Sequence, residues 1–268
     1  MIKTVYLNTI EEVMAMIADQ TRDEKINRLR SDYYYRGQRN VAYKLSTSLS
    51  RHCGAKHAEL ESSILRYFTK YASIEDPTLN ESVWKQMIMG QHYGLPTRLL
   101  DWTRSPLIAL HFAVDETDFK KMDKRDCVVW RMNVKDMNKG LPEKYKEALA
   151  EKKTSTFSVE LLHQMAPSLE EYDRDMGTST MVNLEPPSVS QRIINQYSFF
   201  SVIPSSVTDI EAFFEEHTEQ TVRFVISKEI RWDIRDLLDQ YNVNERIVYP
   251  GLDGLSKWIT RHYFVREK

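Results

Sequence analysis

Residues 91–103, which read QHYGLPTRLLDWT, combine a histidine, an arginine, an aspartate, a tryptophan and an amide in one short segment. Gly94 and Pro96 within it favour a turn. Apolar patterns on both sides, over residues 82–93 and 107–114, predict flanking helices. A rigid polar loop between two apolar helices is costly to build unless something binds there, so we expect a binding loop at this position.

The overall composition predicts a globular protein with one large domain or two small ones. The chain has 268 residues, 41% of them hydrophobic, and a formal net charge of -2. This charge gives no global attraction to nucleic acid or to an anionic membrane. The two cysteines, Cys53 and Cys127, match no zinc-binding spacing, so we expect reduced thiols and no metal site.

No signal-peptide pattern opens the sequence. No apolar run reaches the roughly 18–20 residues that a membrane span needs. We therefore expect an intracellular, cytoplasmic protein without a membrane partner.

Apolar spacing predicts the order of helices and strands along the chain. Thr9 and Glu12 have the spacing of a capping box at the start of a helix, and Ser105 is expected to cap the helix that Pro106 begins. Further helices are expected over residues 59–71, 82–93, 107–114, 228–241 and 252–263, and strands over residues 33–35, 127–130, 198–203, 221–226 and 246–249. Residues 22–32 are expected to be a surface linker or the end of a helix, and residues 135–190 a helical insertion or lid. Because helices dominate the first half and strands concentrate later, the pattern predicts an α+β fold.

The first candidate site is the segment YRGQ at residues 35–38. An arginine at the end of a strand can direct its planar guanidinium at a carboxylate or a phosphate. Gly37 would let a ligand approach the backbone closely. On these residues alone, a surface Arg36 that pairs with a nearby aspartate is the favoured interpretation.

The second candidate site is the opening segment itself. Gly94 is expected as a left-handed residue after the helix that His92 ends, and the helix dipole would bias His92 toward its charged form. An internal ion pair between Arg98 and Asp101 could fix the loop, so we favour a structural role for Asp101. Trp102 is more typical of a core residue than of a stacking platform.

The third and fourth candidate sites lie in the second half of the chain. Arg192, Gln196 and Ser198 alternate with apolar neighbours, as expected for a strand edge facing a cleft, although an ordinary amphipathic strand start fits equally well. Glu245 precedes a predicted strand and is the best free carboxylate of this half. Asp253 is expected to cap the last helix.

These segments, in this order, resemble the FRG domain, a prokaryotic family named for a Phe/Tyr-Arg-Gly motif. The similarity runs from YRGQ at residues 35–38, through residues 91–103 and SPLIAL at 105–110, to YPGLDGL at 249–255. It covers about residues 30–260 and implies a single FRG domain across residues 1–268.

The Tyr-Arg-Gly strand is similar to the first strand of ADP-ribosyltransferases of the Arg-Ser-Glu type. This likeness implies an ADP-ribosyltransferase-like mixed or antiparallel β core with a helical N-terminal half. It also implies NAD as the substrate, a nucleic-acid or protein acceptor, and a setting in bacterial phage defence. No Glu-x-Glu or Gln-x-Glu sequence precedes a late strand, which leaves the position of the acid open. The catalytic residues implied are Arg36, His92 and Glu245, and the NAD-binding residues implied are Arg36, Gly37, Gln38, Gln91, Tyr93, Arg98, Thr103, Gln196 and Ser198.

Two other interpretations remain open. The protein could be a nucleotide- or nucleic-acid-binding module without chemistry. Its basic groove would be formed by Arg36, His92, Arg98 and Arg192, and Trp102 or Tyr93 would stack on bases. Alternatively, an Arg98–Asp101 network could simply lock the helices together. The oligomeric state is left open by the sequence.

Overall fold

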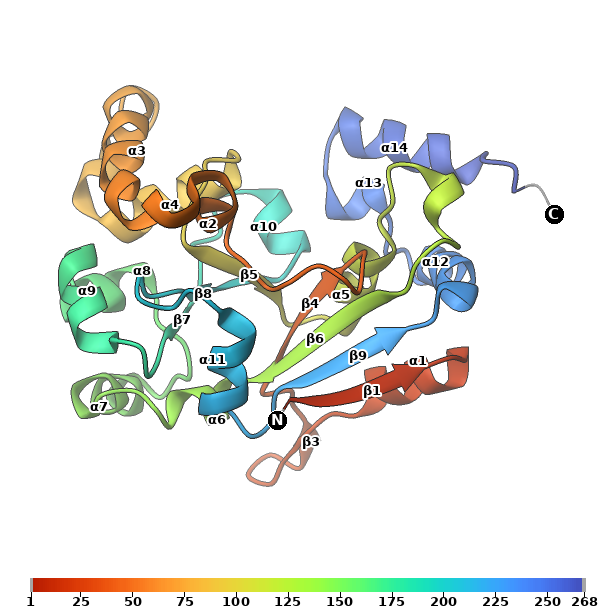
Figure 1. Cartoon of the computed structure of the whole chain (residues 1–268), viewed down its shortest axis with the longest axis horizontal. Coiled ribbons are helices and arrows are strands. Elements are labelled where there is room, and N and C mark those ends of the chain that lie inside the picture. Colours follow the sequence, from red (N-terminus) through yellow and green to blue (C-terminus); the bar gives the residue numbers. More distant parts are fainter. Residues whose placement is uncertain (1, 267–268) are drawn as a thin grey trace.

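The fold is built on a seven-stranded mixed sheet with the order β1-β9-β6-β4-β5-β8-β7 (Figure 1). The computed structural model describes residues 2–266. Strand β1 pairs with β9 in parallel, and the other pairs of this sheet are antiparallel. The strands are β1 (Lys3–Leu7), β4 (Tyr33–Gln38), β5 (Leu99–Thr103), β6 (Cys127–Asn133), β7 (Val182–Leu184), β8 (Ser198–Val202) and β9 (Val222–Ile226). A separate hairpin pairs β2 (Arg22–Asp23) with β3 (Arg28–Leu29).

Helices cover both faces of the sheet and form three hydrophobic clusters with it. They are α1 (Ile10–Ala18), α2 (Ser48–Cys53), α3 (His57–Ala72), α4 (Val83–His92), α5 (Pro106–Val114), α6 (Val134–Asn138), α7 (Glu143–Lys152), α8 (Val159–Met165), α9 (Leu169–Met176), α10 (Gln191–Asn195), α11 (Ile210–His217), α12 (Arg231–Gln240), α13 (Glu245–Val248) and α14 (Leu252–His262). Short 3-10 turns are η1 (Gly54–Lys56), η2 (Pro77–Glu81), η3 (Phe119–Lys121) and η4 (Lys228–Ile230).

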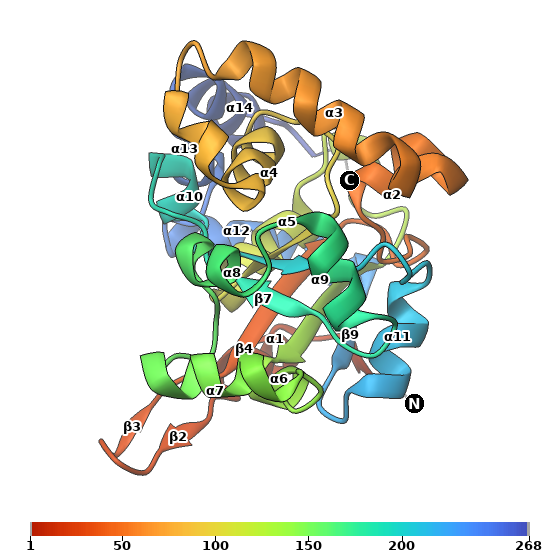
Figure 2. The ribbon, with the colours of Figure 1, turned by 90° about the vertical axis from the view of Figure 1, so that its left-hand side faces the viewer.

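Each cluster joins one set of helices to one part of the sheet. Helices α1, α5 and α12 pack on β1, β4, β6 and β9. Helices α6 and α11 pack on the opposite face, against residues of β4, β5, β6 and β8. Helices α3, α4 and α7–α9 pack around β5, β7 and β8. Figure 2 shows α3 and α4 at one end of the molecule and the β2–β3 hairpin at the opposite end.

The structure confirms the α+β fold class and several local predictions. Thr9 and Glu12 form a reciprocal capping box at the start of α1. Ser105 caps α5 and Pro106 takes a first-turn position, where its missing N–H costs nothing. The apolar run predicted as a strand over residues 127–130 is buried within β6, which extends further to Asn133. Within residues 2–266, no helix combines the length and the apolar character that crossing a membrane requires.

Other predictions about the elements are wrong. The first half is rich in helices, as expected, but the strands do not concentrate later, because β1 to β6 all lie within the first half. The opening segment is not a loop between two helices, because Leu99–Thr103 forms β5 inside the sheet. The expected linker at residues 22–32 contains the β2–β3 hairpin. Residues 135–190 are mainly helical, as expected, but they also supply the edge strand β7.

The structure also corrects two elements of the second half. The strand expected over residues 246–249 is the short helix α13. Asp253 does not cap α14, because Gly251, at φ 112°, occupies the N-cap position and Asp253 lies in the first turn.

Candidate functional site

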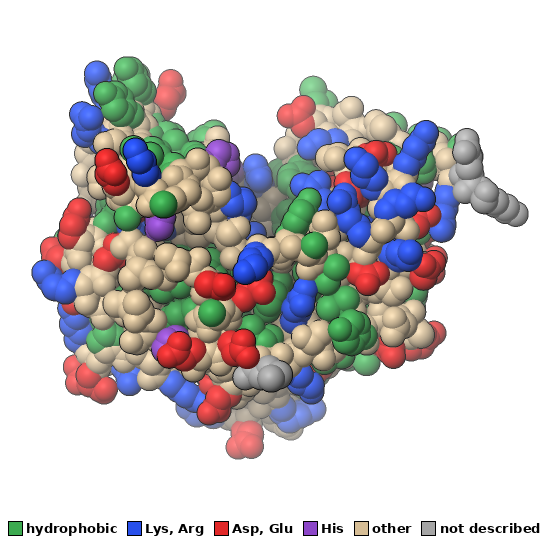
Figure 3. Space-filling view, in the orientation of Figure 1, with side chains coloured by type: hydrophobic (Ala, Val, Ile, Leu, Met, Phe, Trp, Pro, Cys, Tyr) green, Lys and Arg blue, Asp and Glu red, His purple; other side chains and the backbone are tan. Residues whose placement is uncertain are grey.

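The surface is hollowed between the part formed by α2–α4 and the part formed by α13–α14, and Lys and Arg side chains gather along this hollow (Figure 3). Two adjacent cavities in this region share Arg36, Gly37 and Phe112. The compact cavity, about 240 Å³, is lined by Tyr35, Arg36, Gly37, Asp101, Trp102, Thr103, Phe112, Arg192, Gln196 and Ser198. The basic cavity, about 620 Å³, is lined by Arg36, Gly37, Gln38, Arg39, Ala42, Tyr43, Lys44, Ser46, Arg51, Phe112, Asp115 and Tyr249.

The compact cavity exists because β4 and β5 diverge. In the described chain these strands are in register only at Tyr35 and Thr103, after which β4 continues along β6 and β5 along β8. Arg36 spans the gap, since its Nη1 donates to the main-chain oxygen of Asp101 at 2.8 Å. The hydrogen bond from the Arg36 side chain therefore replaces main-chain pairing between β4 and β5, and the cavity lies in the gap between these strands.

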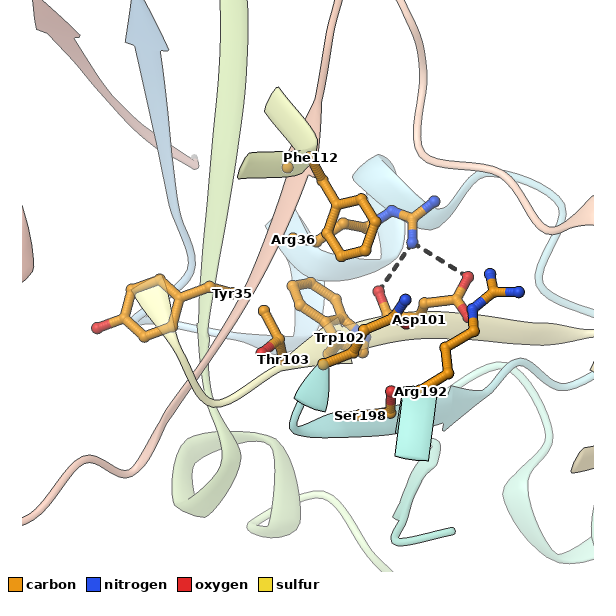
Figure 4. A pocket seen from close by; sticks show the side chains of 10 residues that line it. Tyr35, Arg36, Asp101, Trp102, Thr103, Phe112, Arg192 and Ser198 are labelled. Atoms are coloured by element: carbon orange, nitrogen blue, oxygen red, sulfur yellow. Dashed lines mark hydrogen bonds and ion pairs between the residues drawn. The ribbon is translucent and has the colours of Figure 1, made fainter. Parts of the chain in front are cut away.

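Asp101 provides a carboxylate that is fixed in place but open to a ligand. Its Oδ2 lies 3.4 Å from Nη1 of Arg36 (Figure 4). Gln91 donates from Nε2 to both carboxylate oxygens, at 3.0 and 3.1 Å. Gln91 is itself held by Thr97, whose Oγ1 donates to its Oε1 at 2.6 Å. The Asp101 side chain remains 54% exposed.

The guanidinium of Arg36 is largely withdrawn from water, with its side chain 18% exposed. Burial lowers the pKa of Arg36, and the negative charge of Asp101 opposes that shift. The buried Nε of Arg36 has no hydrogen-bond partner among the described residues. A partly buried cation with spare donor capacity is suited to an anionic ligand.

The third wall of the compact cavity comes from α10 and the start of β8. Ser190 caps α10, and Tyr197, at φ 48°, turns the chain into β8. The expected strand edge at residues 191–196 is therefore a helix, yet the residues predicted to face a cleft do face one: Arg192, Gln196 and Ser198 all line the cavity. Figure 4 shows Arg192 extending toward the Asp101 carboxylate.

Gly37 is required by the packing of α5, and it also lines both cavities. A Cβ added at Gly37 would lie 1.9 Å from the main-chain oxygen of Ala109 and 2.6 Å from the nitrogen of Ala113. Helix α5 can therefore contact β4 only across a glycine. Phe112 lies on α5 between Ala109 and Ala113, so this contact places its side chain in the wall of both cavities.

The basic cavity contains four cationic side chains. Among these, Arg51 donates to the main-chain oxygen and to Oγ of Ser46, at 2.5 and 3.3 Å. Lys44 lies 3.6 Å from Asp209 in an exposed pair. Gln38 bridges the wall, accepting a hydrogen bond from Nε1 of Trp130 at 2.8 Å. The four cations are Arg36, Arg39, Lys44 and Arg51.

Asp115 is a second carboxylate that the sequence did not indicate. It follows the last residue of α5 and accepts a hydrogen bond from the hydroxyl of Tyr249 at 3.2 Å. Burial raises the pKa of Asp115, and the nearby charge of Glu245 raises it further. Among the residues that line the basic cavity in the described chain, Asp115 has the one carboxylate.

Glu245 is not the free carboxylate that we expected. It is buried in α13 and accepts hydrogen bonds from Nε and Nη2 of Arg261, at 2.6 and 2.9 Å. Burial acts to raise the pKa of Glu245, but the hydrogen bonds from Arg261 and the charge of Arg235 outweigh it and lower the pKa. Glu245 lines neither cavity, so its predicted catalytic role is wrong for this geometry.

The predicted pairing of Arg98 with Asp101 is also wrong, because Arg98 binds other carboxylates. It is buried, and its Nε lies 2.9 Å from both carboxylate oxygens of Glu61. Its Nη1 donates to Asp173 at 2.6 Å. Arg98 therefore locks α3 and α9 to β5 instead of pairing with Asp101 or lining the cavities.

His92 and Tyr93 lie at the end of α4 and border neither cavity. Burial and the positive charge of Arg192 lower the pKa of His92, contrary to the shift expected from the helix dipole. Tyr93 is 73% exposed and packs edge-on against His92. Gly94 has the predicted left-handed conformation, at φ 87°.

The predicted core role of Trp102 is confirmed. It is 3% exposed, and its Nε1 donates to Oγ of Ser201 at 2.9 Å. The segment LLDWT around it contains a signal for Asp101 that our reading of a loop missed. Asp101 is the single exposed position between four buried residues of β5, as expected for a polar group aimed out of a core strand.

Comparison with known proteins gives one match. The family model of the FRG domain matches residues 31–122. No curated protein and no solved structure matches the chain. The matched segment includes β4, β5 and α5, and with them Arg36, Asp101 and Phe112. The α10–β8 wall of the compact cavity lies outside it.

Proposed function

From the cavity around Arg36 and Asp101, we propose that the protein binds NAD and cleaves the bond between nicotinamide and ribose. Both residues lie in the segment 31–122 that the family model of the FRG domain matches. The observation that supports this proposal most directly is that a partly buried arginine and an accessible, hydrogen-bonded carboxylate meet where two strands diverge. The ADP-ribose would pass to a protein or nucleic-acid acceptor.

The two cavities match the two halves of a dinucleotide. The compact cavity has room for the nicotinamide and its ribose, with the ring of Phe112 in its wall. The basic cavity would hold the pyrophosphate and the adenosine, beginning at Arg36, which both cavities share. The ring of Tyr43, 49% exposed, offers the adenine a surface for stacking.

The proposed chemistry is mainly electrostatic. When the C–N glycosidic bond breaks, its electron pair leaves with the ring nitrogen, so the pyridinium departs as neutral nicotinamide. The ribose becomes oxocarbenium-like, and the Asp101 carboxylate stabilises the positive charge that develops there. A hydroxyl or amine of the acceptor then attacks C1′ and loses its proton to solvent. Water in place of the acceptor would release free ADP-ribose.

Nicotinamide release from NAD tests this proposal. We expect Asp101→Asn to lower the release rate by about 100-fold or more, because preorganised charges of this kind contribute about 10²–10³-fold. NAD affinity should change only a few-fold, since the amide that replaces the carboxylate keeps the shape of the site. Arg36→Ala should weaken binding as well as release, because it removes the cation that both cavities share.

Asp118→Asn is the matched control. Asp118 caps the η3 turn, outside both cavities, and asparagine caps equally well. The proposal is overturned if Asp101→Asn releases nicotinamide at the rate of the unsubstituted protein. It is also overturned if that protein neither releases nicotinamide nor attaches labelled ADP-ribose to any protein or nucleic acid in a lysate.

A nucleotide-binding module without chemistry is the second candidate, and the basic cavity favours it. Its four cations need no catalytic carboxylate to hold phosphates. Thermal stabilisation by NAD, lost in Arg36→Ala, together with no nicotinamide release under any condition, would identify this function.

A further inference from the structure

The basic cavity has more positive charge than a pyrophosphate needs. We infer that it takes a dinucleotide with an additional phosphomonoester, of the NADP type, in preference to NAD; this rests on the proposed function, which places the pyrophosphate in that cavity. Three cations lie there beyond Arg36, namely Arg39, Lys44 and Arg51.

These three side chains are little engaged by carboxylates. Lys44 pairs with Asp209 at 3.6 Å, but the two side chains are 77% and 49% exposed, so water screens the pair. Arg51 donates to oxygens of Ser46, which are neutral. Arg39 has no ion pair with any residue that the structure describes. Their charge is therefore available to a ligand.

The carboxylate of the same cavity does not cancel this excess. Asp115 is half-buried and accepts a hydrogen bond from the hydroxyl of Tyr249. The positive charge of Arg39 acts to lower the pKa of Asp115, but the structure describes no ion pair between the two residues. Arg36 is already paired with Asp101, and Asp115 alone leaves most of the charge of the three further cations uncompensated. The charge of Arg51 disfavours the charged form of Arg36. An anion that binds in this cavity would reduce the electrostatic repulsion between these neighbouring positive charges.

Charge matching decides between the two dinucleotides. A pyrophosphate diester has about two negative charges, and a phosphomonoester adds about 1.5 to 2 more near neutral pH. Arginine, with its planar fork of donors, binds phosphate oxygens in pairs. Two arginines and a lysine beyond Arg36 therefore suit the second group better than an unphosphorylated ribose.

Calorimetric titration with NAD, NADP, ATP and inorganic phosphate tests the inference. We expect NADP to bind at least tenfold more tightly than NAD, with a steeper loss of affinity as salt is raised. The double variant Arg39→Gln/Arg51→Gln should reduce the ratio of NADP affinity to NAD affinity by at least tenfold. Arg30→Gln is the control, because Arg30 adjoins the β2–β3 hairpin at the end of the molecule away from the hollow (Figures 1 and 2).

Equal affinity for NAD and NADP would overturn the inference, as would an unchanged ratio in the double variant. Binding of ATP or inorganic phosphate as tight as that of NADP would overturn it too, since the cavity would then be a general anion site. Nicotinamide release is scored separately. Release from both dinucleotides without a preference leaves the proposed function intact, whereas selective NADP binding without release overturns only the chemistry.

Discussion

Glu245 and Asp101 each face an arginine, and their surroundings give them different roles. Glu245 uses both carboxylate oxygens on Arg261, and both residues are 5% exposed. Asp101 shares its oxygens between Arg36 and Gln91 and remains 54% exposed. A ligand can reach Asp101 without unfolding any element, whereas Glu245 can be reached only by separating α13 from α14.

Removing Glu245 should therefore affect stability and not chemistry. We expect Glu245→Ala to lower the free energy of unfolding by about 3–5 kcal/mol, because Arg261 keeps a buried charge without its main partner. Glu245→Gln, which keeps the shape, should cost less. Urea denaturation measures the loss, and nicotinamide release per folded molecule should stay unchanged. Glu59→Ala, at an exposed position of α3, is the control. A large loss of release at full stability would contradict this structural role.

At the scale of elements, the contact of β4 with α5 depends on one glycine. The Cβ of Gly37→Ala would overlap the backbone of α5 at Ala109 and Ala113. The helix must move away, so we expect a loss of about 1–3 kcal/mol or more in the free energy of unfolding, as for other overpacked sites. Because Phe112 moves with α5, dinucleotide binding should weaken as well.

Gly140→Ala is the control for this prediction. The nearest atom to its Cβ would be 3.4 Å away, which is an ordinary contact. Thermal denaturation and calorimetric titration of both variants measure the two effects. Equal stability of the two variants would show that α5 tolerates a side chain at position 37.

The elements predicted correctly are those whose signals are local. The capping box of α1, the Ser105–Pro106 start of α5 and the apolar run of β6 depend on near neighbours in the sequence. The short helices α10 and α13 were predicted as a strand edge and a strand. Four or five residues carry too little periodicity to separate helix from strand, and tertiary contacts decide.

The same limit applies to the site. Arg36, Thr103, Gln196 and Ser198 were predicted and do line the compact cavity. An aspartate partner was expected for Arg36, but the sequence did not identify it as Asp101. The two residues lie 65 positions apart, and only the strand order β6-β4-β5 brings them together. We predicted that Asp101 pairs with Arg98, because Arg98 is only three residues away in the sequence, whereas in the structure Asp101 pairs with Arg36.

At the scale of the whole molecule, a buried polar network joins the sheet side of the site to the α13–α14 part. Arg235 of α12 donates to Nδ1 of His111 on α5 at 2.8 Å. Arg261 of α14 binds Glu245 and Asp239. This network fixes the position of α5, and therefore of Phe112, relative to α12, α13 and α14.

The network should make stability depend on pH through His111. Burial, together with the charges of Arg235 and Arg261, lowers the pKa of His111 from 6.5 to about 3. Between these values the unfolded chain binds a proton that the folded chain does not, so stability falls as the pH falls. Each pH unit below 6.5 should cost about 1.4 kcal/mol from this group.

The variant His111→Asn isolates this contribution, because asparagine does not titrate and its Oδ1 can accept the hydrogen bond from Arg235. Urea denaturation at about pH 7.5 and about pH 5 should show the unsubstituted protein losing roughly 2 kcal/mol more than the variant over that interval. Carboxylates with lowered pKa values, such as Glu245, add the same acid loss to both proteins and cancel in the difference. His52→Asn, at an exposed position of α2, should follow the unsubstituted protein. Parallel pH profiles for the protein and His111→Asn would mean that His111 gains its proton in the folded state near its ordinary pKa, with Arg235 moving aside to admit it.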